Sequence, residues 1–122
     1  MSMNFQVKSF ATIRLCVSDV EGCGNWCGAF FGVKPIEDLE GFISFKIGET
    51  TLDICIADAK SPESSGGSIG YWLVDDLNKA VEKAKTLGGK VYRGPLRVEE
   101  VKRTIVQIMT PYGGVVGLEE EY

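Results

Sequence analysis

One unit of sequence occurs twice in this chain: an alternating strand, a tight turn, an amphipathic helix and a glycine. A constant offset that holds through both a strand and a helix predicts an internal repeat, in which two similar units pack together. The matching positions, all at the same offset, are Val17 with Val74, Asp19 with Asp76, Phe30 with Leu87, and Gly32 with Gly89.

The first copy covers residues 12–35. Alternation of apolar Ile13, Leu15 and Val17 with Thr, Arg and Cys is typical of a half-buried strand. Ser18 and Glu21 then have capping-box spacing, so a helix is expected to begin there. Helical spacing of the next apolar residues supports this helix, and Gly32 is a plausible end for it. Those apolar residues are Val20, Cys23, Trp26, Cys27, Phe30 and Phe31.

The other segments complete a strand, a helix and three strands in each half. Further strands are expected at 42–47, 51–56, 69–74, 91–96, 102–109 and 115–119, with a second helix at 77–87. Residues 60–67 read as a polar linker, and residues 1–8 as a short leader. We predict one α+β domain over 1–122, with repeats at about 10–57 and 68–120. The two βαβββ repeats would form a curved mixed sheet with helices on its outer face.

Composition limits the classes of function. The chain has 122 residues, of which 44% are hydrophobic, so it can bury a core as one domain. A net charge of −4 without a Lys/Arg cluster argues against nucleic acid and anionic membranes as partners. No apolar run reaches the roughly 18 residues of a membrane span, and the N-terminus lacks a signal-peptide core, so we expect a cytoplasmic protein.

Strand alternation also predicts which residues face away from the helices. These residues would line a concave inner face, where a ligand could bind. They are Thr12, Arg14, Cys16, Asp53, Cys55, Ile69, Tyr71, Leu73, Gly117 and Glu119.

The duplicated motifs resemble those of the vicinal oxygen chelate superfamily, which includes glyoxalase I, bleomycin and fosfomycin resistance proteins, and extradiol dioxygenases. The resemblance covers residues 10–120. It is carried by Val17-Ser18-Asp19 with Trp26 and Phe31-Gly32, by Val74 to Leu77 with Leu87-Gly88-Gly89, and by the ending Thr110 to Glu120.

The resemblance implies four metal-ligand positions on the concave face. They fall on Thr12, Asp53, Ile69 (or its neighbour Ser68) and Gly117. Only Asp53 among these residues suits a divalent cation, and the chain contains no histidine. Catalytic Zn, Ni or Fe sites normally need three protein ligands, of which imidazole is the usual one. We therefore expect no metal and no cofactor, and we assign no catalytic residue.

Eight residues form the predicted ligand site. Arg14 could replace the missing metal as a fixed cation that anchors a carboxylate or phosphate, or it could be a structural ion pair with Asp53 and Glu119. Cys16 and Cys55 could be a redox pair if their Cα atoms lie within about 7 Å, although buried free thiols are the simpler interpretation of the four cysteines. The ligand-site residues are Arg14, Cys16, Asp53, Cys55, Tyr71, Leu73, Tyr112 and Glu119.

The leading hypothesis for function is a metal-independent protein that sequesters or senses a small organic molecule, aromatic or cationic, and forms a homodimer. A lyase or isomerase of glyoxalase type is the alternative, with Asp53 and Glu119 as acid and base and an atypical metal site. A third interpretation is a structural or regulatory module, or an inactive relative of the dioxygenases, whose cleft is filled by its own side chains.

Overall fold

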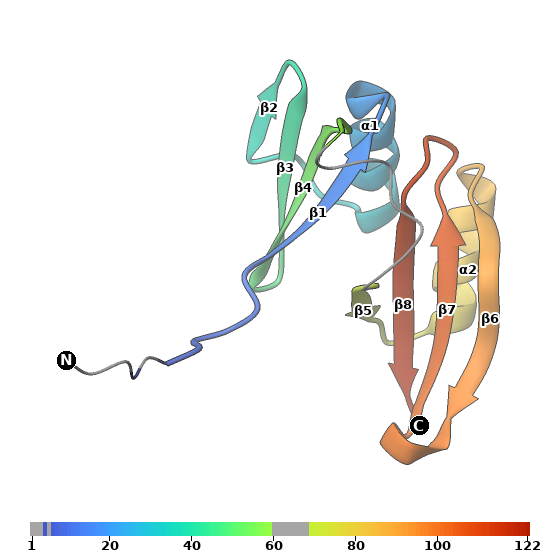
Figure 1. The fold of residues 1–122 in the computed structure, drawn as a ribbon. Coiled ribbons are helices and arrows are strands. Elements are labelled where there is room, and N and C mark those ends of the chain that lie inside the picture. The colour runs from blue at the N-terminus through green and yellow to red at the C-terminus, as the bar shows by residue number, and fades with distance from the viewer. Residues whose placement is uncertain (1–3, 5, 60–68) are drawn as a thin grey trace.

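The computed structural model describes residues 4, 6–59 and 69–122, and Figure 1 shows its eleven elements in chain order. The first repeat contains β1 (Thr12–Val17), α1 (Val20–Phe31), β2 (Glu37–Leu39), β3 (Phe42–Ile47) and β4 (Thr50–Ile56). The second contains β5 (Tyr71–Leu73), α2 (Leu77–Thr86), β6 (Lys90–Val98), the 3₁₀ helix η1 (Glu99–Val101), β7 (Arg103–Met109) and β8 (Val115–Glu121).

The strands form two four-stranded mixed sheets with the same internal order. The first sheet has the order β1-β4-β3-β2 and the second β5-β8-β7-β6. In each sheet the first strand of the repeat pairs in parallel with the last one. The predicted α+β class with two strand-helix-three-strand units is confirmed. The predicted single curved sheet is instead two sheets, in which β1 and β5 are edge strands.

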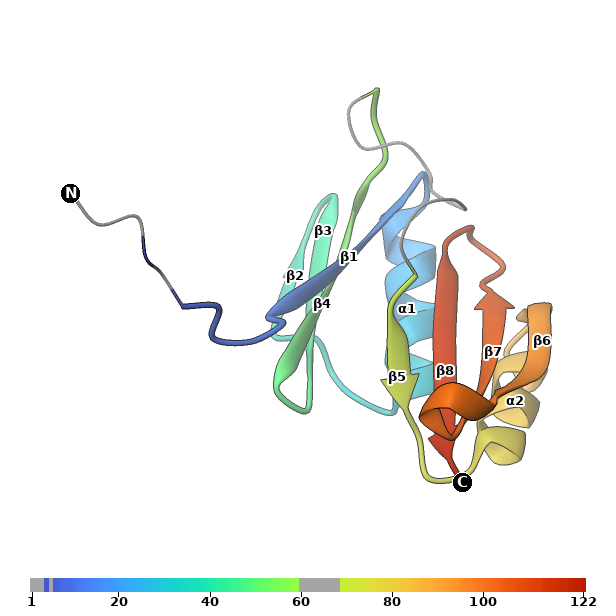
Figure 2. The same ribbon diagram turned by 60° about the horizontal axis from the view of Figure 1, so that its bottom comes forward.

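The two sheets meet along β1. The side chain of Ile13 lies where a Cβ on Gly70 would be, so the chain entering β5 passes close to β1. Gly114, just before β8, also lies beside β1, where a Cβ on it would be in ordinary contact with Leu15 and Val17. In Figures 1 and 2, α1 lies between the first sheet and the second, and the N-terminal segment extends away from the body.

The helix ends follow the repeat, with one correction. The N-cap of α1 is Asp19, whose carboxylate accepts a hydrogen bond from the backbone of Gly22, and not Ser18 as the capping-box spacing predicted. Asp76, the matching residue, caps α2 in the same way. Gly32 ends α1 in the left-handed conformation, as expected. The glycine pair Gly88-Gly89 follows the end of α2, and Gly88 is the residue of this pair in the left-handed conformation.

Three segments differ from the sequence expectation. The short strand β2 was not predicted from its residues, because all three of them are exposed and show no apolar alternation. Strand β5 is shorter than the predicted 69–74, and the 3₁₀ helix η1 lies between β6 and β7, where no helix was predicted. The predicted linker at 60–67 lies outside the described residues.

One apolar core joins both repeats. Trp26 on α1 stacks on Phe30, with ring centroids 5.1 Å apart, and its indole Nε1 donates a hydrogen bond to the carbonyl of Leu87 at 2.8 Å. Phe31 continues this aromatic contact to Trp72 in β5. Helix α1 therefore fastens the first repeat to the second through its own side chains.

The two cysteines of α1 belong to this core. Cys23 and Cys27 are fully buried and reduced. The hydrogen bond with the Cys23 thiol, together with burial, raises the pKa of the Cys27 thiol, which therefore stays neutral. This pair packs as small apolar side chains. No helix in the described part of the chain has the length and apolar character needed to cross a membrane.

Candidate functional site

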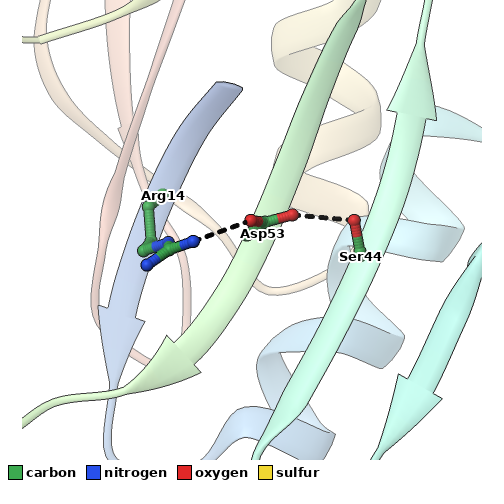
Figure 3. Close-up of polar contacts among 3 residues, drawn as sticks. All are labelled: Arg14, Ser44 and Asp53. Carbon is green, nitrogen blue, oxygen red and sulfur yellow. Dashed lines mark hydrogen bonds and ion pairs between the residues drawn. The ribbon is translucent and has the colours of Figure 1, made fainter. Parts of the chain in front are cut away.

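A polar network crosses three strands on the face opposite α1. The register places Arg14 of β1, Asp53 of β4 and Ser44 of β3 side by side. Arg14 donates from a terminal guanidinium nitrogen to Oδ2 of Asp53 at 3.2 Å, and the Ser44 hydroxyl donates to Oδ1 at 2.7 Å. Figure 3 shows the three side chains aligned across the sheet. Both carboxylate oxygens of Asp53 are therefore engaged.

The two charges of this pair differ in exposure. The Asp53 side chain is 9% exposed, whereas that of Arg14 is 60% exposed. The hydrogen bond to Asp53 raises the pKa of Arg14, so the guanidinium stays charged. A buried carboxylate thus orients an arginine whose remaining surface faces the solvent. Such an arginine can bind an anionic group with little further loss of side-chain freedom.

We predict that Asp53→Ala and Arg14→Ala both lower the stability. The first leaves the buried Ser44 hydroxyl without its acceptor, so the free energy of unfolding should fall by about 1–3 kcal/mol. The second leaves the buried Asp53 carboxylate without its cation, so it should cost at least as much, even though the removed side chain is mostly exposed. Urea unfolding followed by circular dichroism measures both values. A loss below about 0.5 kcal/mol for both variants, within the range of ordinary surface substitutions, would contradict a structural role for this network.

Glu119 does not join this network. Its carboxylate forms an ion pair with Arg103 of β7 at 2.9 Å, within the second sheet. The sequence grouped Arg14 with Asp53 and Glu119, and the structure brings only the first two together. The two carboxylates therefore belong to separate ion pairs, each with its own arginine.

Cys16 and Cys55 are neighbours on the same face. They are Cα partners in the parallel β1–β4 pair, two residues beyond Arg14 and Asp53. Both are free and partly exposed. Burial raises the pKa of the Cys55 thiol, although the charge of Arg14 acts in the opposite direction.

Tyr71 fills the space over Gly117. The two residues are partners in the β5–β8 pair, and the Tyr71 hydroxyl accepts a hydrogen bond from Nε2 of Gln107 at 2.8 Å. A Cβ on Gly117 would lie 2.5 Å from the carbonyl oxygen of Gly70 and 2.6 Å from the Tyr71 ring. A larger side chain at position 117 would therefore require this face of the second sheet to rearrange.

Two predicted site residues lie apart from the network. Tyr112 packs against the first turn of α1, where its ring occupies the space a Cβ on Gly22 would need. Leu73 is 56% exposed and borders a cavity between the end of α1 and the start of α2. Trp26 is buried in the core, as its place on the apolar side of the helix predicts.

Of the three cavities considered for a ligand, one small cavity borders the polar network, through Arg14. A cavity of about 520 Å³ lies on the helix side and is lined by residues including Phe31, Trp72 and Lys83. Two smaller cavities lie beside β1: one of about 80 Å³ lined by Arg14 and Cys16 among others, and one of about 70 Å³ next to Tyr71. Pockets for drug-sized ligands measure roughly 300–1,000 Å³, so neither small cavity encloses such a ligand by itself.

The residues at the four positions where the superfamily holds its metal do not fit a divalent cation. Thr12 is exposed at the start of β1, Ile69 precedes β5, and Ser68 lies outside the described residues. Gly117 offers no donor side chain, and both oxygens of Asp53 already accept hydrogen bonds. Among residues 4, 6–59 and 69–122, no group of three or more His, Cys, Asp or Glu side chains could hold a metal ion.

The sequence reasoning missed three partners: Ser44, Arg103 and Gln107. Ser44 is the one small polar residue in an otherwise apolar and aromatic strand, with Lys46 beyond it, so strand alternation alone could have placed it beside Asp53. Arg103 and Gln107 share the face of Glu119 by the same rule, but their contacts depend on the β7–β8 register, which the sequence does not give.

Comparison with solved structures shows the same architecture in other proteins. A glyoxalase/bleomycin resistance protein/dioxygenase family enzyme from Burkholderia phytofirmans has a TM-score of 0.76 and 16% identity, with 92% of this chain and 98% of that chain covered. A glyoxalase/bleomycin resistance protein from Albidiferax ferrireducens gives 0.74 and 15%, with 93% and 98% covered. Lactoylglutathione lyase from Agrobacterium tumefaciens gives 0.70 and 21%, with 93% and 94% covered.

The sequence itself matches no protein-family model and no curated protein. At 15–21% identity the structural likeness shows the fold and leaves activity to the residues of the site. The chain has the fold of the glyoxalase/bleomycin resistance/dioxygenase proteins, which is the fold of the vicinal oxygen chelate superfamily that its motifs resemble.

Proposed function

We propose that this protein binds a small organic molecule on the concave face, through Arg14 and without a divalent metal, to sequester or sense it. The observation that carries the proposal is the Arg14–Asp53–Ser44 network, in which a buried carboxylate orients an exposed guanidinium. The donor set at the superfamily's metal positions supports the metal-independent part, because it offers one carboxylate that is already engaged.

The charges of the face favour an anionic ligand group. Asp53 and Glu119 each have an arginine partner, so neither offers a free negative charge to a cation. Arg14 uses one terminal nitrogen for Asp53 and exposes most of its side chain. A carboxylate or phosphate can accept from the rest of this planar donor group. Ile13 lines both the cavity that Arg14 borders and the cavity next to Tyr71, and these two apolar side chains would suit an aromatic ligand body.

The small size of the cavities beside β1 supports a homodimer as the binding form. Arg14 borders a cavity of about 80 Å³, which is far below the volume of pockets that enclose organic ligands. A second copy placed over the same face would close the site and exclude water from it. The proposed unit is therefore a homodimer with ligand between the concave face and the partner subunit.

A thermal-shift screen tests the proposal, because a ligand that binds only the folded state raises the melting temperature. The screen uses aromatic carboxylates, aromatic phosphates and aromatic cations, all in the presence of EDTA. We expect aromatic anions to stabilise the protein and cations to have no effect. The affinity of a stabilising compound is then measured by isothermal titration calorimetry.

Two variants identify the site. Arg14→Ala should weaken binding by roughly 10-fold or more, since a charge-assisted hydrogen bond contributes about 1.5–3 kcal/mol. Lys83→Ala, in the larger cavity on the helix side, is the matched control and should leave the affinity unchanged. Unchanged binding by Arg14→Ala, or loss of binding by Lys83→Ala, would contradict the proposed site. The same screen is repeated with zinc, nickel or manganese in place of EDTA, and a compound that stabilises the protein only with one of these metals would favour the glyoxalase-type alternative.

A further inference from the structure

Cys16 and Cys55 form a pair of thiols that the proposed function does not use. They are opposite each other in the parallel β1–β4 pair, so their side chains leave the sheet on the same side. Both residues are partly exposed, in contrast to the fully buried Cys23 and Cys27. Cys16 borders the small cavity that also contains Arg14. A reagent in solution can therefore reach this pair.

The spacing of the strands suits an ion between the two sulfurs. Neighbouring strands lie about 4.7–4.9 Å apart, which is also the separation expected for the Cβ atoms of residues in register. A metal–thiolate bond is about 2.3 Å long, so two sulfurs on opposite sides of one ion are about 4.6 Å apart. A disulfide needs Cβ atoms only about 3.8 Å apart, which would draw the strands together. An ion bridge fits the undistorted sheet better than a disulfide.

We propose that Cys16 and Cys55 bind one soft monovalent cation of the Cu(I) class as a two-coordinate bis-thiolate complex. Thiolate sulfur is the ligand that soft ions select. The described residues offer no third ligand that would complete a zinc or iron site, because no group of three or more ligating side chains occurs among them. A linear ion needs only the two sulfurs that the register supplies.

The charges of the complex also balance locally. Two thiols release two protons and bind one monovalent ion, which leaves one net negative charge on the sulfur–metal–sulfur unit; no oxidation or reduction takes place. The Arg14 guanidinium interacts electrostatically with both Cys16 and Cys55. This cation can compensate the charge of the complex. The inference goes beyond the proposed organic-ligand function, and either one can hold without the other.

The test is an anaerobic titration of the reduced protein with Cu(I), in competition with the colorimetric chelator bicinchoninate. We expect one tightly bound Cu(I) per chain. Loss of a residue that only supports a metal ligand typically costs 10–100-fold in affinity, so loss of one of two ligands in Cys16→Ser or Cys55→Ser should weaken binding by about 100-fold or more. The double variant Cys16→Ser/Cys55→Ser is the matched control, because it keeps the buried cysteines of α1.

Two results of the titration would overturn the proposal. In the first, the wild type takes no Cu(I) from the chelator. In the second, the double variant binds Cu(I) as tightly as the wild type. Circular dichroism shows whether each variant folds. A second measurement needs no variant: bound Cu(I) should protect Cys16 and Cys55 of the wild type from alkylation, as read by peptide mass spectrometry. Alkylation of both residues at the same rate with and without Cu(I) would also overturn it.

Discussion

Replacing Trp26 with alanine is expected to lower the free energy of unfolding by about 3–5 kcal/mol, the usual cost of deleting a large aromatic side chain from a core. Trp26 is only 5% exposed, stacks on Phe30 and donates to the carbonyl of Leu87 in the second repeat. Its loss removes apolar contacts and also a hydrogen bond between the repeats. Because domains of this size are stable by only about 5–15 kcal/mol, the variant should unfold at much lower urea concentration.

Trp26→Phe is the matched control. It keeps an aromatic ring against Phe30 but removes the indole donor, so it should cost less than the alanine variant while still leaving the Leu87 carbonyl without its partner. Leaving this carbonyl without a donor is expected to lower the free energy of unfolding by about 1–3 kcal/mol. Urea unfolding of both variants gives the comparison. A cost below about 1 kcal/mol for Trp26→Ala, within the range of ordinary substitutions, would contradict the role of α1 in fastening the repeats together.

Gly117→Glu is expected to lower the free energy of unfolding by about 3 kcal/mol or more. Overpacking usually costs about 1–3 kcal/mol, and this position lies at the upper end of that range. Position 117 is where the resemblance places the last metal ligand of the superfamily. A Cβ there would meet the Gly70 carbonyl oxygen at 2.5 Å and the Tyr71 ring at 2.6 Å, and the first of these is backbone that cannot rotate away. Gly117→Glu should therefore disturb the β5–β8 pair and gain no affinity for zinc or nickel.

Thr12→Glu tests the same idea at an open position. Thr12 also corresponds to a metal-ligand position but is exposed at the start of β1, so a glutamate there should change stability by less than about 0.5 kcal/mol. Thermal unfolding followed by circular dichroism compares the two variants. A Gly117→Glu protein as stable as the wild type would show that the Tyr71 ring and the Gly70 backbone do not restrict this position.

Much of the fold could be predicted from the sequence, because the strand and helix patterns are local and each of them occurs twice. The pattern of Ile13, Leu15 and Val17 gives a strand and its buried face, and the following helix has a glycine where it must end. The capping residue was predicted one position early, because Ser18 and Asp19 are both good caps and only the helix geometry separates them. Strand β2 carries no apolar pattern and depends on pairing with β3.

For the candidate site, the sequence predicted which residues share one face of the sheet but not which of them are in contact. Alternation placed Arg14, Asp53 and the two partly exposed cysteines on one side of the first sheet, and the register confirms that they are neighbours. Strand alternation does not predict the distance between residues that belong to different sheets. Glu119 was therefore grouped with Arg14, although its partner is Arg103, which lies in the same sheet as Glu119. Contacts between the sheets depend on packing that no local pattern encodes.

In the proposed function, fixed side-chain charge on this face takes the place of a divalent metal. Elemental analysis of the wild-type protein, incubated with excess zinc, nickel, manganese and iron(II) and then passed through a gel-filtration column, tests it most directly. We predict a content of each metal well below one ion per chain. One retained zinc, nickel, manganese or iron ion per chain, lost when Asp53 is replaced by alanine, would contradict the account.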